Sequence, residues 1–484
     1  MSTGMQPQTP VQPQPGSSDR PTGPKNIVIC CDGTGNEFGD ANSNVVKLYT
    51  ALAIDNQQVG YYHPGVGTMG DPTERYRIPR WWSQVKGLAF ANGFKDNVLD
   101  AYRYLMNMYN DGDKVYLFGF SRGAYTVRAL AGLLNGYGLL CRGNEGHIPY
   151  AWRLYVNQHQ DRNRHSVDST IDSGDAFKET FSHQNFSIKF LGVWDTVSSV
   201  GWVYTPLRLF SVARNNSVLC GRHAISIDER RCFYTDNLWG KPYPDQNLVQ
   251  VWFAGAHSDV GGSYPQEESG LSNITLEWML NEAEEAGVIL VPDRVNLVLG
   301  RPSSTYPAAG NLYETPKKSM VHDSLTGPWW IPEYIPGIYY DKDLSKDAYR
   351  VPLGTPRKLP HGALLHHTVY ERLQDKSANY DPANLKTGKL TPTTYPAAHS
   401  ARNNSVLYEY QPTNDKKPGT FKRRALIGLF GTLDSILVLC LVSIIAIAFA
   451  GILHLLSWAI GCAYFKLGVW VMKHLGPRVH RLFF

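Results

Sequence analysis

The stretch from Lys114 to Leu134, KVYLFGFSRGAYTVRALAGLL, constrains the fold of this chain more than any other. It opens with an apolar run of the kind that a buried parallel strand needs, and it ends in a helical pattern of Ala, Leu and Val. The turn between them is Gly-Phe-Ser-Arg-Gly, which contains Ser121. A strand, a Gly-x-Ser-x-Gly turn and a helix make a nucleophile elbow, which holds the serine hydroxyl above the sheet. The pattern therefore predicts Ser121 as a nucleophile, and the alternative is a serine that merely caps the helix.

Apolar runs alternate with helical patterns on both sides of this stretch, which predicts an α/β fold with a mostly parallel, doubly wound sheet. We expect further strands at 26–31, 58–62, 187–193 and 248–254, and helices at 41–54, 97–109 and 273–285. Functional side chains in such sheets gather at the carboxyl ends of the strands. The polar residues expected at these ends are Asp32, Ser121, Asp195, His257 and Asp259.

The composition argues against two classes of function. A net charge of +5 over 484 residues is weak, and no dense basic patch is interleaved with aromatic residues. Nucleic acid is therefore not expected as a partner. The seven cysteines are scattered and form no CxxC pair, so we expect neither a disulfide framework nor a zinc site. No cluster of residues requires a metal or another cofactor.

The composition also divides the chain into segments. Residues 1–24 are rich in Pro, Gln, Ser and Gly and predict a disordered tail without a cleavable secretory signal. We expect the catalytic domain, with its insertions, at 25–405 and a polar linker at 406–424.

The last segment, 425–484, predicts a membrane anchor. Residues 435–465 form a run of 31 residues without a formal charge. Because about 20 such residues cross a bilayer, a tilted single span and a hairpin both fit. Basic residues flank both sides, so the positive-inside rule does not orient the segment. A tail anchor of this kind would leave the catalytic domain in the cytosol.

Several motifs together show a family resemblance. They occur between about residues 27 and 325 in the order ICCDGTGN, YYHPGVGT, GFSRGAYTVRALAGLL, FLGVWDTV, HAISIDERR, FAGAHSDVGGSY and VHDSL. This series resembles the α/β-hydrolase family that includes the phospholipase effectors of bacterial type VI secretion systems (Tle-type). The resemblance implies a Ser-His-Asp hydrolase of esters, with lipids as the substrate class. Both the tail and the membrane segment lie outside it.

A serine hydrolase needs a histidine to accept the serine proton and an acid to orient that histidine. In α/β hydrolases the three follow in the order Ser, acid, His. Two assignments satisfy this order, namely Asp195 with His257 and Asp259 with His322. We favour the second, because the acid usually follows the second strand after the elbow, here 248–254, and the histidine follows the last strand. The unused pair would then bond the loops around the site.

Backbone N–H groups should bind the oxyanion that forms during the reaction. We expect that of Arg122 and one from Gly33 or Thr34. The sequence thus predicts a membrane-anchored serine hydrolase of acyl esters, a phospholipase or lipase. The alternatives are an esterase for soluble or protein-bound acyl groups, and an inactive membrane-tethered scaffold of the same fold.

Overall fold

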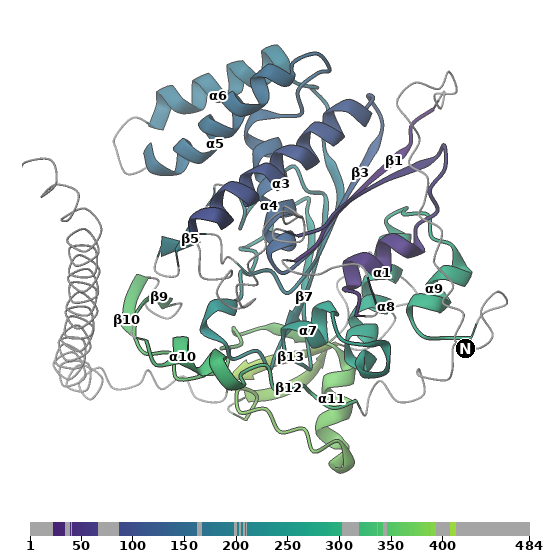
Figure 1. Ribbon diagram of the computed structural model, residues 1–484, viewed down its shortest axis with the longest axis vertical. Helices are drawn as coiled ribbons and strands as arrows, with labels where there is room; N and C mark the ends of the chain where they lie inside the picture. Colours follow the sequence, from purple (N-terminus) through teal and green to yellow (C-terminus); the bar gives the residue numbers. More distant parts are fainter. Residues whose placement is uncertain are drawn as a thin grey trace, which may run out of the picture. The chain divides into compact units, whose positions relative to one another are not determined.

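The computed structural model describes residues 23–412 except 34–38, 40, 66–86, 162–166, 198–200, 203–204, 207–208, 210, 303–318, 336, 342–345, 387 and 394–406. Over these residues the main sheet has the strand order β12-β13-β11-β8-β7-β4-β3-β1-β2 (Figure 1). Its strands are β1 (Asn26–Cys31), β2 (Gln58–His63), β3 (Lys114–Phe120), β4 (Ile188–Trp194), β7 (Cys220–Ser226), β8 (Asn247–Phe253), β11 (Ala363–Leu365), β12 (Gly388–Thr393) and β13 (Leu407–Pro412). Neighbours from β2 across to β11 run parallel, whereas β13 and β12 are antiparallel. The predicted mostly parallel α/β sheet is confirmed.

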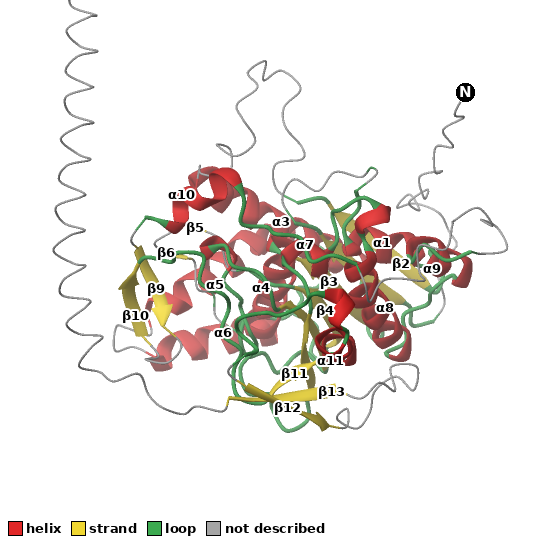
Figure 2. Cartoon of the chain, turned by 90° about the horizontal axis from the view of Figure 1, so that it is seen from below, coloured by secondary structure: helices red, strands yellow, loops and turns green. Residues whose placement is uncertain are grey.

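Helices cover both faces of this sheet (Figures 1 and 2). One face packs against α3 (Gly87–Met108) and α4 (Arg122–Tyr137), and α5 (Ile148–Asp161) and α6 (Val167–Phe181) pack on α4. The other packs against α1 (Asn44–Ala51), α8 (Gly270–Glu285) and α9 (Pro292–Val298). Successive strand residues point to opposite faces, so β1 sends Ile27 and Ile29 to the first core and Val28 and Cys30 to the second. A strand buried on both faces is typically a nearly continuous apolar run, as β1 is from Ile27 to Cys31.

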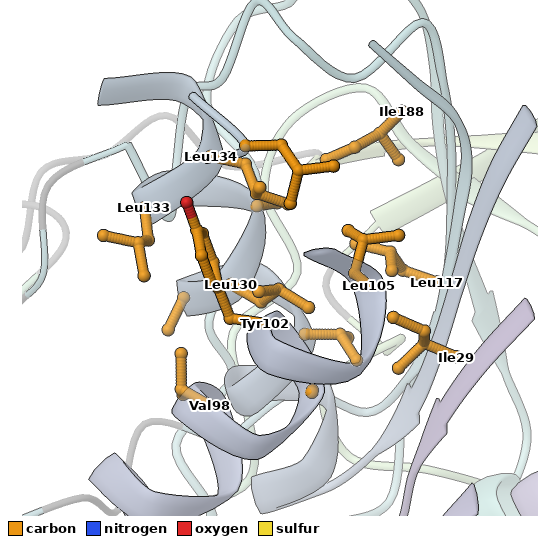
Figure 3. Packing of buried hydrophobic residues seen from close by; sticks show 14 of the residues in the cluster. Ile29, Val98, Tyr102, Leu105, Leu117, Leu130, Leu133, Leu134 and Ile188 are labelled. Atoms are coloured by element: carbon orange, nitrogen blue, oxygen red, sulfur yellow. The ribbon is translucent and has the colours of Figure 1, made fainter. Parts of the chain in front are cut away.

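The first core lies between the sheet and the pair α3 and α4 (Figure 3). Leu105 and Leu130 meet Leu117 of β3 there, and all three are fully buried. Tyr102 is also fully buried. Its hydroxyl donates to the Gly138 carbonyl at 2.9 Å and accepts from the Leu140 N–H at 2.9 Å. The hydroxyl thus donates one hydrogen bond and accepts another, and these bonds compensate for the water that it loses on burial.

Strand β7 was not expected from the sequence, because it buries polar residues. Arg222 is 1% exposed and pairs with Glu282 of α8 at 2.6 Å. His223 is fully buried and accepts a hydrogen bond from the Thr196 N–H at 3.1 Å. Since β7 lies between β4 and β8, the strand at 248–254 is not the second sheet strand after the elbow. The expectation that Asp259 follows the second strand after the elbow is therefore wrong.

The main sheet extends beyond the expected boundary at residue 405, because β13 belongs to it. This strand pairs with β11 and β12, and its Leu407 and Tyr410 are buried. Contacts divide the chain into two compact units at Asn414. The predicted membrane segment at 435–465, the rest of the linker and the tail up to residue 22 lie outside the described residues. Within the described residues, no helix is both long and apolar enough to cross a membrane.

The start of α4 packs so closely on β1 that Gly123 has no room for a side chain. A Cβ atom there would lie 2.1 Å from the Cys31 carbonyl oxygen and 2.5 Å from that of Asp32. We predict that Gly123→Ala lowers the free energy of unfolding by roughly 1–3 kcal/mol, the usual cost of overpacking. Urea unfolding measures this. Gly146→Ala is the control, because a Cβ atom there meets nothing within 4 Å. Equal midpoints for the two variants would contradict the packing.

Candidate active site

Ser121 lies between β3, which ends at Phe120, and α4, which begins at Arg122. Its backbone has φ 58° and ψ −120°. A non-glycine residue with positive φ costs on the order of 1–3 kcal/mol and persists only where its surroundings hold it. The Ser121 side chain makes no capping hydrogen bond to α4. The turn therefore has the conformation of a nucleophile elbow, and the capping alternative does not fit.

Two backbone hydrogen bonds hold this strained turn against the turn that follows β4. The Ser121 N–H donates to the Trp194 carbonyl at 3.1 Å, and the Val197 N–H donates to the Ser121 carbonyl at 3.5 Å. Asp195 lies between Trp194 and Val197 and also has a positive φ, 38°. The backbone of Ser121 is thus hydrogen-bonded to Trp194 and Val197, which lie before and after the buried Asp195 in the chain.

Asp195 is 1% exposed and accepts hydrogen bonds from several directions. Its Oδ2 lies 2.5 Å from Nδ1 of His257. Its Oδ1 accepts from the N–H and the hydroxyl of Ser226 at 2.9 and 3.1 Å. These contacts fix the orientation of the carboxylate, which in turn orients the imidazole.

Arg357 adds a cation to the partners of this carboxylate. Its Nη1 lies 2.6 Å from Oδ1 of Asp195, and its Nη2 lies 3.0 Å from Oδ2. Burial by itself raises the pKa of Asp195, but Arg357 and His257 hold that pKa well below its usual range. Asp195 is therefore ionised at any pH at which the protein would work.

His257 is the first residue of the short helix α7 (His257–Gly261) and is 4% exposed. Its ring lies 4.6 Å from the ring of Phe120 and 4.6 Å from that of Tyr234, between centroids. Burial lowers the pKa of His257 by more than the bond to Asp195 raises it. The imidazole is therefore neutral near pH 7. With its Nδ1 proton directed to Asp195, Nε2 is the nitrogen that can accept a proton.

The second predicted pair is also formed. Nδ1 of His322 lies 2.6 Å from Oδ1 of Asp259, and the His322 N–H donates to Oδ2 at 3.0 Å. The His322 ring stacks on Tyr264 at 3.9 Å, and its Nε2 lies 3.4 Å from a carboxylate oxygen of Glu268. Both nitrogens of this ring thus face carboxylates. Because Asp259 follows His257 on α7, the two Asp–His pairs are neighbours.

The candidate oxyanion donors differ in what they already bond. The N–H of Gly33 donates to Oδ1 of Asp32 at 2.6 Å, so it is used within its own loop. Oδ2 of Asp32 accepts from the hydroxyls of Ser43 at 2.5 Å and Tyr62 at 3.0 Å. Thr34 lies outside the described residues. Arg122 follows Ser121 as the first residue of α4, where a helix N-terminus favours negative charge.

Two residues that sequence reasoning missed support the site. Arg357 belongs to no motif, and it reaches Asp195 from 162 positions away. Glu229, within the motif HAISIDERR, is fully buried and accepts from the His257 N–H at 3.2 Å. Burial raises the pKa of Glu229, but Arg231 beside it lowers that pKa to about 2. The motif could have pointed to Glu229, whereas only the fold places Arg357.

Residues 25–282 match the family described as "T6SS, Phospholipase effector Tle1-like, catalytic domain". The chain belongs to this family. Membership confirms the family resemblance of the motifs. The match contains Ser121, Asp195 and His257, and it ends before His322 and Arg357.

Individual relatives add little about function. The chain is 37% identical over 217 residues to "Uncharacterized protein YEL023C" of Saccharomyces cerevisiae (strain ATCC 204508 / S288c), covering 43% of this chain and 31% of that protein. It thus spans about a third of the length of that relative.

Solved structures that are similar to the chain include the following three. An uncharacterized protein from Pseudomonas aeruginosa is 19% identical, with 61% of this chain and 52% of that one covered and a TM-score of 0.36. The Tle1 effector bound to the VgrG spike is 15% identical, with 81% and 92% covered and a TM-score of 0.36. The esterase Est2 of Thermogutta terrifontis is 13% identical, with 57% and 86% covered and a TM-score of 0.28. At these TM-scores the likenesses carry no argument about function.

The pair formed by Arg357 and Asp195 yields a prediction about this Tle1-like domain. Arg357→Met leaves the carboxylate buried without its strongest cation, so we predict a loss of roughly 3–5 kcal/mol in unfolding free energy. Arg153→Met is the control, since Arg153 is exposed and lies over the ring of Tyr150. Urea unfolding compares the two. An Arg357→Met midpoint equal to that of the control would contradict the described pair.

Proposed function

We propose that the chain is a serine hydrolase that cleaves the acyl esters of phospholipids. Ser121 is the nucleophile, His257 is the general base and Asp195 orients His257. One observation carries the assignment. The backbone of Ser121 bonds to the residues on both sides of Asp195, and Asp195 bonds His257 at 2.5 Å.

Each of the three side chains has a defined role in the proposed reaction. Ser121 Oγ attacks the ester carbonyl while Nε2 of His257 takes its proton. The protonated imidazole, stabilised by Asp195, then gives that proton to the departing alcohol, which leaves an acyl-enzyme. Water activated by His257 releases the fatty acid and restores Ser121. The N–H of Arg122 stabilises the oxyanion in both halves of the reaction. This chemistry calls for no metal or other cofactor.

Two contacts support His257 over His322 as the base. The ring of His257 packs on Phe120, the residue directly before Ser121. Nε2 of His322 lies 3.4 Å from a carboxylate oxygen of Glu268, which competes with a serine hydroxyl for that nitrogen. We therefore reverse the preference derived from the sequence. In this proposal Asp259 and His322 hold the segment 319–326 against α7.

The family description supports lipid as the substrate class, because it is that of phospholipase effectors. We propose that residues 435–465 anchor the chain in a membrane and leave the catalytic domain on the cytosolic side. An esterase for soluble or protein-bound acyl groups is the second candidate, since the same three side chains would serve it. An inactive scaffold is the third, but a strained Ser121 beside a buried Asp–His pair counts against it.

The first prediction of this proposal concerns single substitutions in the full chain. Ser121→Ala and His257→Ala should each lower fatty-acid release from phosphatidylcholine vesicles by a factor on the order of 10⁴ or more. His322→Ala, the matched control, should retain activity within about tenfold.

The outcomes separate the candidates. A loss with His322→Ala equal to that with His257→Ala would restore the Asp259–His322 assignment. If wild type reacts with a fluorophosphonate probe but releases no fatty acid from vesicles, the soluble-ester reading is correct. If folded wild type does neither, the chain is a scaffold.

The second prediction concerns pH. A general base must be neutral, and burial lowers the pKa of His257 from its ordinary value of 6.5. The value of kcat/KM should therefore be constant around pH 7 and fall only as pH drops through a midpoint below 6.5. Asp195 adds no second acid limb in this range, because its pKa is depressed. A pH profile with a water-soluble short-chain ester measures this. An acid midpoint at or above pH 7 would contradict the assignment.

A further inference from the structure

Large apolar side chains are exposed around the short helix α10 (Trp330–Glu333). The exposed fractions are 58% for Ile331, 62% for Tyr334, 44% for Ile335 and 56% for Leu353. Leu353 adjoins the helix because its N–H donates to the Glu333 carbonyl at 3.0 Å. We call these four side chains the α10 patch. Such a cluster, unlike scattered exposed apolar residues, marks a binding surface.

None of the four side chains of the α10 patch is charged, and the carboxylate of α10, that of Glu333, points inward. Glu333 is fully buried. Its Oε1 accepts from the Cys232 N–H at 2.6 Å, and its Oε2 accepts from the Gly354 N–H at 2.9 Å. These bonds fasten α10 to the turn η2 (Cys232–Tyr234) and to the loop that carries Leu353. The patch is therefore held in a defined position relative to η2.

From η2 one aromatic ring leads to the proposed catalytic base. The Tyr234 ring lies 4.6 Å from that of His257 and 5.8 Å from that of Trp329, which directly precedes α10. The guanidinium of Arg231 lies over both aromatic rings, at 3.8 Å from Tyr234 and 4.9 Å from Trp329. Two aromatic rings, those of Trp329 and Tyr234, thus connect the start of α10, beside the patch, to His257.

We propose that the α10 patch docks on the surface of a phospholipid bilayer and brings the site to its substrate. This inference rests on the proposed function. Tyr and Trp beside aliphatic side chains, without charge, are the residues that settle at the boundary between headgroups and acyl chains. A phospholipid is insoluble in water, so its ester must reach His257 from the bilayer. A surface that two aromatic rings connect to His257 shortens that path.

The length of chain beyond the sheet fits this occupant. Residues 413–434, 22 in number, separate β13 from the apolar run at 435–465. Fully extended they reach at most about 80 Å. If 435–465 spans a bilayer, as proposed above, the catalytic domain stays beside that same bilayer and meets it at high effective concentration. A protein partner has no comparable support among the described residues.

The test uses the full chain reconstituted in dioleoylphosphatidylcholine vesicles. In the double variant Ile331→Asp with Tyr334→Asp, fatty-acid release should fall at least about tenfold, while hydrolysis of a water-soluble short-chain ester stays unchanged. Tyr150→Asp is the matched control, since Tyr150 is a tyrosine on α5 with 42% exposure. It should change neither rate. If both rates fall in the double variant, or neither does, the inference is overturned.

A second readout does not depend on catalysis. In a Ser121→Ala background, brominated phosphatidylcholine should quench tryptophan emission less when the α10 patch carries the two aspartates. The expected difference comes from Trp329 and Trp330, because the tryptophans of the tail contribute equally to both proteins. Equal quenching overturns the docking surface even if the chain proves to be a lipase. If the two aspartates reduce quenching but the chain cleaves no lipid, the proposed function is contradicted and the docking surface is supported.

Discussion

The candidate site depends on the backbone of one residue, Ser121. A positive φ at a serine is unfavourable by itself, so something must hold it. Two hydrogen bonds from the turn after β4 do so, and the close packing of Gly123 on β1 leaves the turn little freedom. Because the same turn carries Asp195, the interaction that maintains the strain also positions the proposed acid. The proposed nucleophile and the proposed acid are therefore placed by a single local arrangement of backbone.

The second constraint is electrostatic. A buried carboxylate is costly unless it is paired and hydrogen-bonded. Asp195 has Arg357 on one side and His257 on the other, with Ser226 donating to Oδ1. Arg357 keeps the carboxylate ionised, and burial keeps the imidazole neutral. Such a pair is prepared to take up a proton and to stabilise the resulting cation, which is what a general base requires.

The strands that could be predicted are those made mostly of apolar side chains. The positions of β1, β2, β3, β4 and β8 follow from the sequence to within two residues. β7 could not be found in this way, since Arg222 and His223 are buried through partners that only the fold supplies. β11 has three residues, too few for any periodic signal.

The two Asp–His pairs could be predicted from the sequence, but which of them serves Ser121 could not. Both Asp–His pairs were named from motifs, and both are formed. His257 and Asp259 lie two residues apart on α7, so their order in the chain cannot tell which pair meets Ser121. That depends on the hydrogen bonds across β3 and β4 and on the ring of Phe120, which are tertiary contacts. Arg357 belongs to none of the motifs, and only the packing of a distant loop places it beside Asp195.

The most direct test of the central claim is the rate at which a fluorophosphonate probe labels Ser121 in Asp195→Asn and in Asp259→Asn. An asparagine at the acid position misorients the histidine proton and lowers the reactivity of the serine by a factor on the order of 10⁴. We predict a loss of that size for Asp195→Asn and labelling near the wild-type rate for Asp259→Asn. The reverse order, with attachment still at Ser121, would contradict the account and assign the acid to Asp259.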